Sequence, residues 1–289
     1  MKCDLHVHTI HSGMCTVPGF RRLCRESYSH PAELYDTLKR RGMDLVTVTD
    51  HDSIDAAESL GHHADFFLSE EVSCRTSRGT ELHVGVYDIA ERDHAELQRR
   101  REDLPSLLAY LDGRRLLYSI NHVYSGLTGP RVESDFEEFA ERFPAVETLN
   151  GQMLAIANRL AGEFAANHHK IAVAGSDAHT LASLGRTYTR VPGARTRGEF
   201  LQGLRRGRTV TLGESGHYAK LTRAVLEIAC DMIRERRWTF LLAPLLAGVP
   251  LVILANLALE TAFAYKWGRR TARFDLRLEK SLGSSLAAR

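Results

Sequence analysis

The chain has few cysteines, and none of them pairs in a metal-binding or disulfide pattern. The five cysteines among 289 residues form no CxxC motif and no even framework: Cys3, Cys15, Cys24, Cys74 and Cys230. This pattern argues against a disulfide scaffold and a thiolate zinc site, and it suits a reducing compartment. The first residues, MKCDLHVH, lack the apolar stretch of a signal peptide, so a cytoplasmic start is expected.

A strong charge of either sign is also missing. The net charge is +2, but residues 218–289 carry 12 Lys/Arg against 6 Asp/Glu, which leaves −4 on residues 1–217. A first part with this charge is poorly suited to holding a polyanion, so extended nucleic-acid binding is not expected. No internal repeat is visible. All 14 histidines lie in residues 1–217, and any chemistry is therefore expected there.

What the chain does contain is an alternation of strand and helix patterns. The expected helices cover 32–44, 93–112, 133–143, 152–169 and 197–205, and the expected strands cover 2–8, 44–50, 66–73, 81–89, 116–122, 145–150 and 170–179. This alternation predicts a parallel α/β architecture, and about seven evenly spaced strands favour a β/α barrel over an open sheet.

Histidines and carboxylates gather at the ends of these strands. In DLHVHT (4–9), His6 and His8 alternate in a strand and project from the same face. Side chains of the same kind end the later strands, as Asp50, His51, Glu71, His122, Asp177 and His179, while His83 lies nearer the start of its strand. Barrel active sites form at the carboxyl ends of strands. Imidazole and carboxylate together suit Zn, Mn or Fe in a hydrolytic site with several ions.

These segments resemble the successive motifs of the PHP (polymerase and histidinol phosphatase) superfamily. The resemblance covers residues 2–215 and rests on DLHVHT (4–9), VTDHDS (48–53), EEVSC (70–74), ELHVGVY (81–87), INH (120–122), VETLNG (146–151) and GSDAHT (175–180). It implies a distorted seven-stranded β/α barrel, two or three divalent transition metals (Zn, Mn or Fe), and hydrolysis of a phosphoester by hydroxide that the ions generate.

The resemblance also implies a role for each ligand. His6, His8 and Asp177 would hold a first ion, Glu71 would bridge it to a second ion held by His83 and His122, and His51 and His179 would hold a third. Catalysis would then depend on Asp177, His179 and Glu71. Asp50 is expected to orient a histidine ring, and Glu70 is expected to face away from Glu71 in the strand.

The chain departs from the family pattern at the third ion. Related sequences often place an Asp or His five or six residues after the second histidine of H-x-H, where this chain has Gly13 and Met14. His11 is the preferred replacement because imidazole matches the other ligands. Cys15 as the ligand, a dinuclear site and a weakly held third ion remain open.

The substrate is expected to be a small phosphorylated metabolite, a nucleotide or an oligonucleotide end. Arg75 and Arg186 are candidates for binding its phosphate, because a guanidinium matches phosphate oxygens bidentately. Both follow metal-ligand motifs. The alternatives are hydrolysis of another ester or an amide by the same ions, and a membrane-attached binding protein with a residual metal site.

The C-terminal quarter contains a long uncharged run. Residues 1–217 form the expected hydrolase domain, followed by a basic linker helix (218–238), a transmembrane segment (239–265) and a basic tail (266–289). Residues 239–259 include no charge, and as a helix they would span about 30 Å, the thickness of a bilayer core. The only two tryptophans, Trp238 and Trp267, flank the run. A catalytic domain anchored to the inner face of the cell membrane is expected, and a helix buried in a dimer or against the barrel is the alternative.

Overall fold

A computed structural model describes residues 1–17 and 19–287, with side chains described to Arg273. The side chains of most of the expected tail, 274–289, lie outside this range. The strands are β1 (Lys2–Cys3), β2 (Ser69–Arg75), β3 (Glu81–Tyr87), β4 (Leu117–Ile120), β5 (Ala145–Asn150), β6 (Ile171–Gly175), β7 (Thr187–Arg190) and β8 (Val210–Gly213). They form one curled half-barrel sheet in the order β1-β7-β6-β5-β4-β3-β2, with β8 paired to β7.

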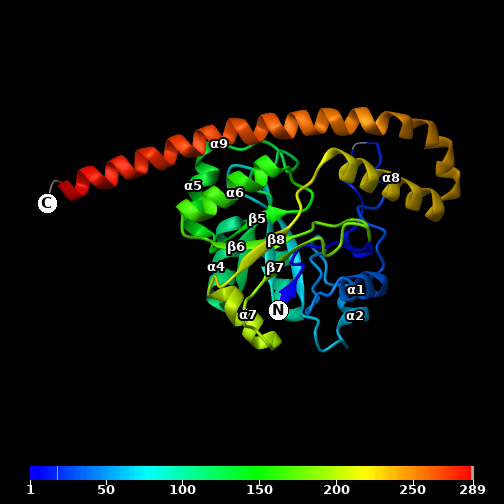
Figure 1. Cartoon of the computed structure of the whole chain (residues 1–289), viewed down its shortest axis with the longest axis horizontal. Coiled ribbons are helices and arrows are strands. Elements are labelled where there is room, and N and C mark those ends of the chain that lie inside the picture. The colour runs from blue at the N-terminus through cyan, green and yellow to red at the C-terminus, as the bar shows by residue number, and fades with distance from the viewer. Residues whose placement is uncertain (18, 288–289) are drawn as a thin grey trace.

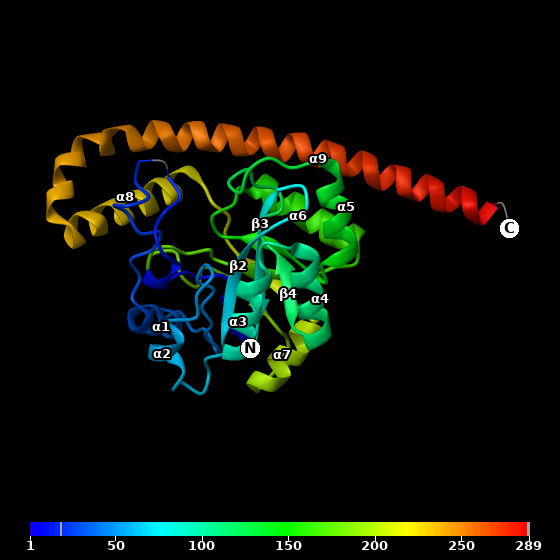
Figure 2. The same ribbon diagram turned by 180° about the vertical axis from the view of Figure 1, so that it is seen from behind.

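Helices surround this sheet and the extended segments beside it (Figures 1 and 2). They are η1 (Ile10–Ser12), α1 (Pro31–Arg40), α2 (Ala57–Leu60), α3 (Glu91–Arg100), α4 (Leu104–Arg114), α5 (Glu133–Arg142), α6 (Ala155–Asn167) and α7 (Arg197–Arg205). One hydrophobic cluster joins β2–β5 to α3–α6, a second joins β1 and β6 to α7, and a third packs α1 against the extended chain around Val7 and Val46.

The sheet is mixed, which corrects the expectation of a parallel architecture. β2, β3 and β4 are antiparallel neighbours, and only β4, β5 and β6 pair in parallel. The cause is the short connection between β2 and β3, residues 76–80, because a parallel crossover needs a dozen residues or more. The antiparallel pairing sets Ser73 opposite His83, so the start of β3 lies beside the end of β2. His83 therefore reaches the edge where the other ligands gather.

Three expected elements differ clearly in the structure. The expected strand 2–8 is a strand only at Lys2–Cys3, with an isolated bridge from Val7 to Ala178. Residues 44–50 form an extended segment that meets its neighbours through single bridges, Val46 to Phe66 and His51 to Glu71, and not a regular strand. The expected helix 93–112 is two helices, because α4 starts afresh at Leu104 with Pro105 in its first turn.

The C-terminal part folds back over the domain. Helix α8 (Tyr218–Glu235) is followed by the 3₁₀ segment η2 (Arg237–Gly248), where the chain turns, and by the long helix α9 (Val249–Ala287). Pro244, Gly248 and Pro250 lie at this turn, and proline removes backbone donors that a straight helix needs. Figures 1 and 2 show α9 crossing above α6 and α5. Trp267 is only 1% exposed and stacks on Phe136 of α5 with ring centroids 5.2 Å apart, so it lies in the core and not at a membrane interface.

Candidate metal centre

Three overlapping sets of ligand atoms meet at the edge of the sheet. In each set the ligand atoms lie within 4.8 Å of one another, and the sets are His6–His8–Asp177, His6–Glu71–His122 and His8–His51–Glu71. His83 and His179 lie beside them, with Nδ1 atoms 3.6 Å from Glu71 and 3.8 Å from Asp177. The structure thus brings together eight of the nine ligands named from the sequence. They come from the segments around β1, β2, β3, β4 and β6 and, for His51, from the extended segment before α2.

Glu71 lies between two groups of histidines. Its Oε2 is 3.1 Å from His6 Nε2 and 3.3 Å from His51 Nδ1, while its Oε1 is 3.2 Å from His122 Nε2. One carboxylate oxygen therefore faces each group, which is the arrangement of a bridging ligand. Glu70 faces the other way, toward His94 at 2.6 Å, as alternation along the strand requires.

His11 does not join this centre. Its Nδ1 lies 3.9 Å from Asp55, and its side chain is 30% exposed. The carboxylate next to His51 and His179 belongs instead to Glu26, whose Oε1 is 3.5 Å and 3.4 Å from their Nε2 atoms. Glu26 was not predicted, because it lies in an irregular loop 18 residues after His8. The only signal in the sequence is an acidic residue in an otherwise basic loop.

Buried hydrogen bonds fix the ring orientation of the two first histidines. Ser12 Oγ donates to Asp50 Oδ1 at 2.6 Å, so the His8 Nδ1–H must donate to Ser12 Oγ, 2.9 Å away. This tautomer leaves the lone pair of His8 Nε2 facing Asp177. Asp50 thus orients a histidine through Ser12. His6 Nδ1 lies 2.7 Å from Glu147 Oε1, a second carboxylate that the sequence did not single out, and donation to it leaves His6 Nε2 free to bind an ion.

The donor set fits divalent metal ions. The buried imidazole nitrogens without a hydrogen bond in the described chain include His8 Nε2, His51 Nδ1, His83 Nδ1 and His179 Nδ1. Each lies 3.3–3.8 Å from an oxygen of Glu71 or Asp177. Bonds of 2.0–2.2 Å to one tetrahedral ion put neighbouring ligand atoms ~3.4 Å apart. The unpaired nitrogens are therefore spaced as ligands around shared ions.

The electrostatics favour the ligand forms of Glu71, Asp177 and His8, whereas the nearby carboxylates raise the pKa of His6, His51 and His179, so an ion that binds those three must displace protons. Burial alone would raise the pKa of Glu71, but the surrounding imidazoles, His6 foremost, hold it well below its ordinary value. Asp177 is likewise held ionised against its burial by His6 and His8. Burial, together with neighbouring His179, lowers the pKa of His8 to about 3. Carboxylates stay charged and His8 stays neutral, which are the forms that bind cations.

Two of the candidate ligands have strained backbones. His122 and Asp177 have φ angles of 32° and 50°, in the left-handed region that side chains other than glycine rarely adopt. Asn150 donates to the Asp177 carboxylate at 3.0 Å, and Asn121 donates to Glu71 at 2.8 Å. Such strain concentrates at functional sites, where the surrounding structure holds it in place.

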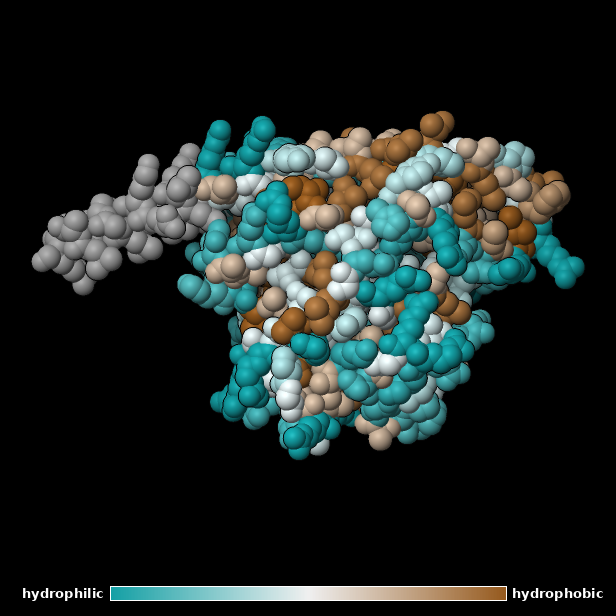
Figure 3. Space-filling view, in the orientation of Figure 1, coloured by the Kyte–Doolittle hydropathy of each residue, from teal (hydrophilic) through white to brown (hydrophobic). Residues whose placement is uncertain are grey.

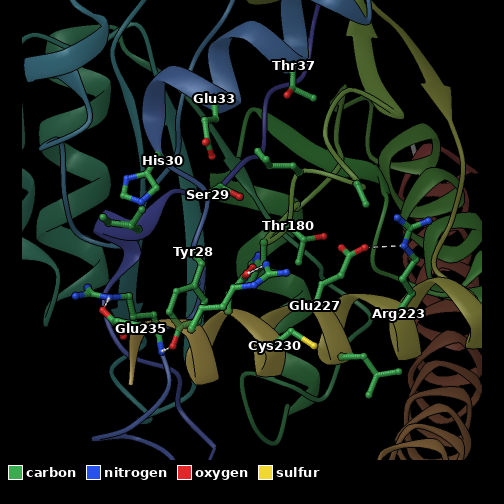
Figure 4. A pocket seen from close by; sticks show the side chains of 18 of the residues that line it. Tyr28, Ser29, His30, Glu33, Thr37, Thr180, Arg223, Glu227, Cys230 and Glu235 are labelled. Carbon is green, nitrogen blue, oxygen red and sulfur yellow. Dashed lines mark hydrogen bonds and ion pairs between the residues drawn. The ribbon is translucent and has the colours of Figure 1, made fainter. Parts of the chain in front are cut away.

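The two predicted phosphate-binding arginines lie apart from this centre. Arg75 faces Glu81 at 3.6 Å and Arg186 faces Glu214 at 3.9 Å, and both side chains are more than half exposed. A cavity of about 1330 Å³ that reaches His179 lies between α1 and α8 (Figure 4). Its walls present five other arginines, Arg25, Arg40, Arg41, Arg223 and Arg234.

A family model described as PHP-associated matches residues 155–209. This match covers about a fifth of the chain, and it agrees with the motifs and with their convergence at one centre. The chain is thus similar to the PHP superfamily. No curated protein matches the chain.

Solved structures of similar shape include PsfC from Pseudomonas syringae PB-5123, with a TM-score of 0.57 and 19% identity over 80% of this chain and 97% of that one. At this identity the likeness to PsfC is one of fold. An amidohydrolase from Chromobacterium violaceum is similar with a TM-score of 0.48 and 15% identity over 73% of this chain and 98% of that one. The lesion-specific endonuclease PfuEndoQ from Pyrococcus furiosus has a TM-score of 0.47 and 16% identity over 71% of this chain and 55% of that one.

Proposed function

We propose that this protein is a metal-dependent hydrolase that cleaves phosphoesters. The observation that carries the proposal is the position of Glu71, which directs one carboxylate oxygen to each of two histidine groups. A site built to hold adjacent cations suits a phosphoester, because its several charged oxygens and its departing oxygen can each be stabilised by a cation.

His6, His8 and Asp177 would hold one ion, His83 and His122 a second beside Glu71, and His51, His179 and Glu26 a third. Bound ions would supply Lewis-acid catalysis and lower the pKa of a water molecule. The residues around them keep this set in place. Glu147 and Ser12 fix the tautomers of His6 and His8, and Asn150 holds Asp177. In the reaction a water oxygen bonds to phosphorus, the ester P–O bond breaks, and the departing oxygen takes a proton from that water.

The test is elemental analysis of the full chain together with a substrate panel of phosphomonoesters, phosphodiesters, carboxylic esters and amides, assayed with Zn²⁺ or Mn²⁺. We expect two or three equivalents of metal and hydrolysis of phosphoesters that stops on chelation. Asp177→Asn should lower the rate about 1000-fold or more, while the exposed Asp36→Asn should not. Less than one equivalent of metal after reconstitution, or hydrolysis of amides alone, would contradict the proposal.

We further propose that the turn between α8 and α9 attaches the protein to a membrane. The described chain contains one helical stretch apolar enough to span a bilayer, Arg237–Arg273, and only 6% of its most apolar window is buried. Leu241, Leu245, Leu251 and Val252 are 59–73% exposed, and Figure 3 shows a hydrophobic surface over this region. The exposed side chains disfavour burial against the barrel and leave the dimer as the competing explanation.

Leu251→Glu/Val252→Glu should abolish cosedimentation of the full chain with anionic vesicles, because each charge would have to enter the apolar layer. Val210→Glu, which changes an exposed apolar residue of β8 paired with Arg190 of β7, should bind as the unchanged protein does. Full-length protein that stays in solution as a dimer, without detergent or vesicles, would favour the dimer interface instead.

A further inference from the structure

A narrow apolar slot leads from the metal centre to the C-terminal helices. It has a volume of about 240 Å³ and ends at Asp177 and His179. The α8 side contributes Leu221, Ala224, Val225 and Ile228, the α9 side contributes Ile253 and Leu257, and the floor is formed by Leu127, Met153, Leu154 and Ala157. The apolar lining would contact hydrocarbon, and the two candidate metal ligands at its end would hold ions that bind an anionic group.

The remaining polar groups of the slot do not create an anion site. Glu260 accepts from Ser125 Oγ at 2.7 Å and from the Gly126 N–H at 3.2 Å, so its carboxylate is already engaged. Gln152 and Asn256 are the other polar residues, and none of the described residues that line the slot is a lysine or an arginine. Beyond the metal ligands, the slot is therefore complementary to hydrocarbon.

The large cavity on the other side of His179 has a different chemistry. Three of its arginines are neutralised by carboxylates at 2.6–2.8 Å: Arg25 by Glu235, Arg223 by Glu227 and Arg234 by Asp231. It is wide enough to admit water and to release a phosphate, and it includes only one of the candidate ligands. The slot includes two, so a substrate that fills the slot has the closer approach to the metal centre.

The helix that walls the slot also carries an apolar outer surface. Ile253 and Leu257 belong to the uncharged run of α9, and residues on the same stretch, Leu251 and Leu254, are 70% and 51% exposed. The helix that forms this wall is thus apolar on its exposed side and, apart from Glu260 and Asn256, on the side that lines the slot.

We infer that the substrate is a phosphate ester of an alcohol that carries an aliphatic chain. This inference rests on the proposed function. The phosphate lies at Asp177 and His179, and the chain lies between α8 and α9. Hydrolysis consumes one water, breaks the bond between phosphorus and the alcohol oxygen, and yields the long-chain alcohol and inorganic phosphate. The volume of the slot, below the ~300–1000 Å³ of sites for drug-sized ligands, suits one chain.

The first experiment measures binding of methylphosphonate and octylphosphonate, which cannot be hydrolysed at an ester bond, to the metal-loaded full chain by calorimetry. We expect octylphosphonate to bind at least ~10-fold more tightly, since each buried methylene adds to affinity. Equal affinity for the two compounds would overturn the inference.

Matched variants on α8 test the slot itself. Ala224→Phe fills the slot and should remove the advantage of the octyl chain while leaving methylphosphonate binding unchanged. Ala219→Phe, which lines the large cavity and not the slot, should leave both affinities unchanged. If Ala224→Phe fails to fold, Val225→Trp, at the exposed edge of the slot, provides the same measurement. An octyl advantage that survives in the folded slot variant would refute the inference.

Hydrolysis of methyl and octyl phosphate separates the two proposals. If octylphosphonate binds more tightly than methylphosphonate and neither ester is hydrolysed, the proposed phosphoesterase activity fails while the slot stands as a binding site for an aliphatic chain. If both esters are hydrolysed at the same kcat/KM, the activity stands and the slot does not select substrates.

Discussion

At the scale of single residues, the metal centre depends on small side chains that touch no ion. Asp50 orients His8 through Ser12. The one hydroxyl proton of Ser12 is donated to the Asp50 carboxylate, so the Ser12 oxygen can only accept a hydrogen bond from His8. The serine therefore determines which nitrogen of His8 is free.

Ser12→Ala should weaken metal binding. Without Ser12 the His8 ring loses its partner at Nδ1, and loss of such supporting contacts costs about 10- to 100-fold in metal affinity. Titration against a competing chelator measures the change, with the exposed Ser59→Ala as the control. Unchanged affinity in Ser12→Ala would show that packing alone orients the ring.

Gly175 allows β6 to approach the first strand. A Cβ at this position would lie 2.3 Å from His6 Cβ and 2.4 Å from the His6 nitrogen. Gly175→Ala should lower the free energy of unfolding by about 1–3 kcal/mol through overpacking and displace His6, with loss of metal. At Gly162 of α6 an added Cβ would meet no other atom within 4 Å, and Gly162→Ala should be neutral or slightly stabilising. Equal stability of the two variants in urea denaturation would contradict this account.

At the scale of elements, α3 is attached to β2 through a buried ion pair. Glu70 Oε2 and His94 Nδ1 are 2.6 Å apart, and Glu70 is fully buried. Burial raises the pKa of Glu70 while the bond to His94 opposes that rise. The same bond raises the pKa of His94 above its ordinary value of 6.5.

The stabilisation that this pair provides should depend on pH. Because the folded-state pKa of His94 is raised, the contribution is fully present below pH 6.5 and is lost as the pH rises through the raised value. The difference in urea midpoint between the unchanged protein and His94→Gln should be largest near pH 6 and shrink toward pH 9. The exposed His62→Gln should show no such trend. A difference in urea midpoint that grows with pH would contradict this prediction.

Comparison of the expected and the observed helices and strands shows what could be predicted from the sequence. Helix α7 and strand β5 were predicted with their observed bounds, because amphipathic spacing and short strand patterns are local signals. β2 and β3 pair in an antiparallel way because the connection between them is short. His83 lies near the start of its strand, which would place it away from the other ligands in a parallel sheet but places it beside them in an antiparallel one. Glu26 could not be found by spacing, because an irregular loop places it beside His51 and His179. The course of such a loop leaves no periodic pattern in the sequence.

At the scale of the whole molecule, the two tryptophans have opposite environments. Trp267 is buried between α9 and α5, whereas Trp238 is 56% exposed at the turn. Similar spacing around an apolar run suggested two similar interface residues. The two tryptophans differ because α9 packs on the domain at Trp267. The amino-acid composition on either side of the apolar run does not reveal that packing.

Trp267→Ala should lower the free energy of unfolding by about 3–5 kcal/mol, as large-to-small changes in a core do. Trp238→Ala should leave it nearly unchanged in aqueous solution and should weaken vesicle binding. Thermal unfolding and cosedimentation measure the two effects. Equal destabilisation by both substitutions would argue that α9 does not dock on the domain in solution.

The contact between Glu260 and the loop after β4 has a consequence for how this protein can be divided. Ser125 and Gly126 rely on a carboxylate of α9, and the Ser125 N–H in turn donates to the carbonyl oxygen of His122 at 3.0 Å. A truncation at residue 217 would remove that carboxylate and expose the aromatic cluster around Phe136. Metal counts and rates measured on such a fragment would describe a site whose His122 loop has lost part of its support, so the metal centre should be assayed on a chain that keeps Glu260 and Trp267 of α9.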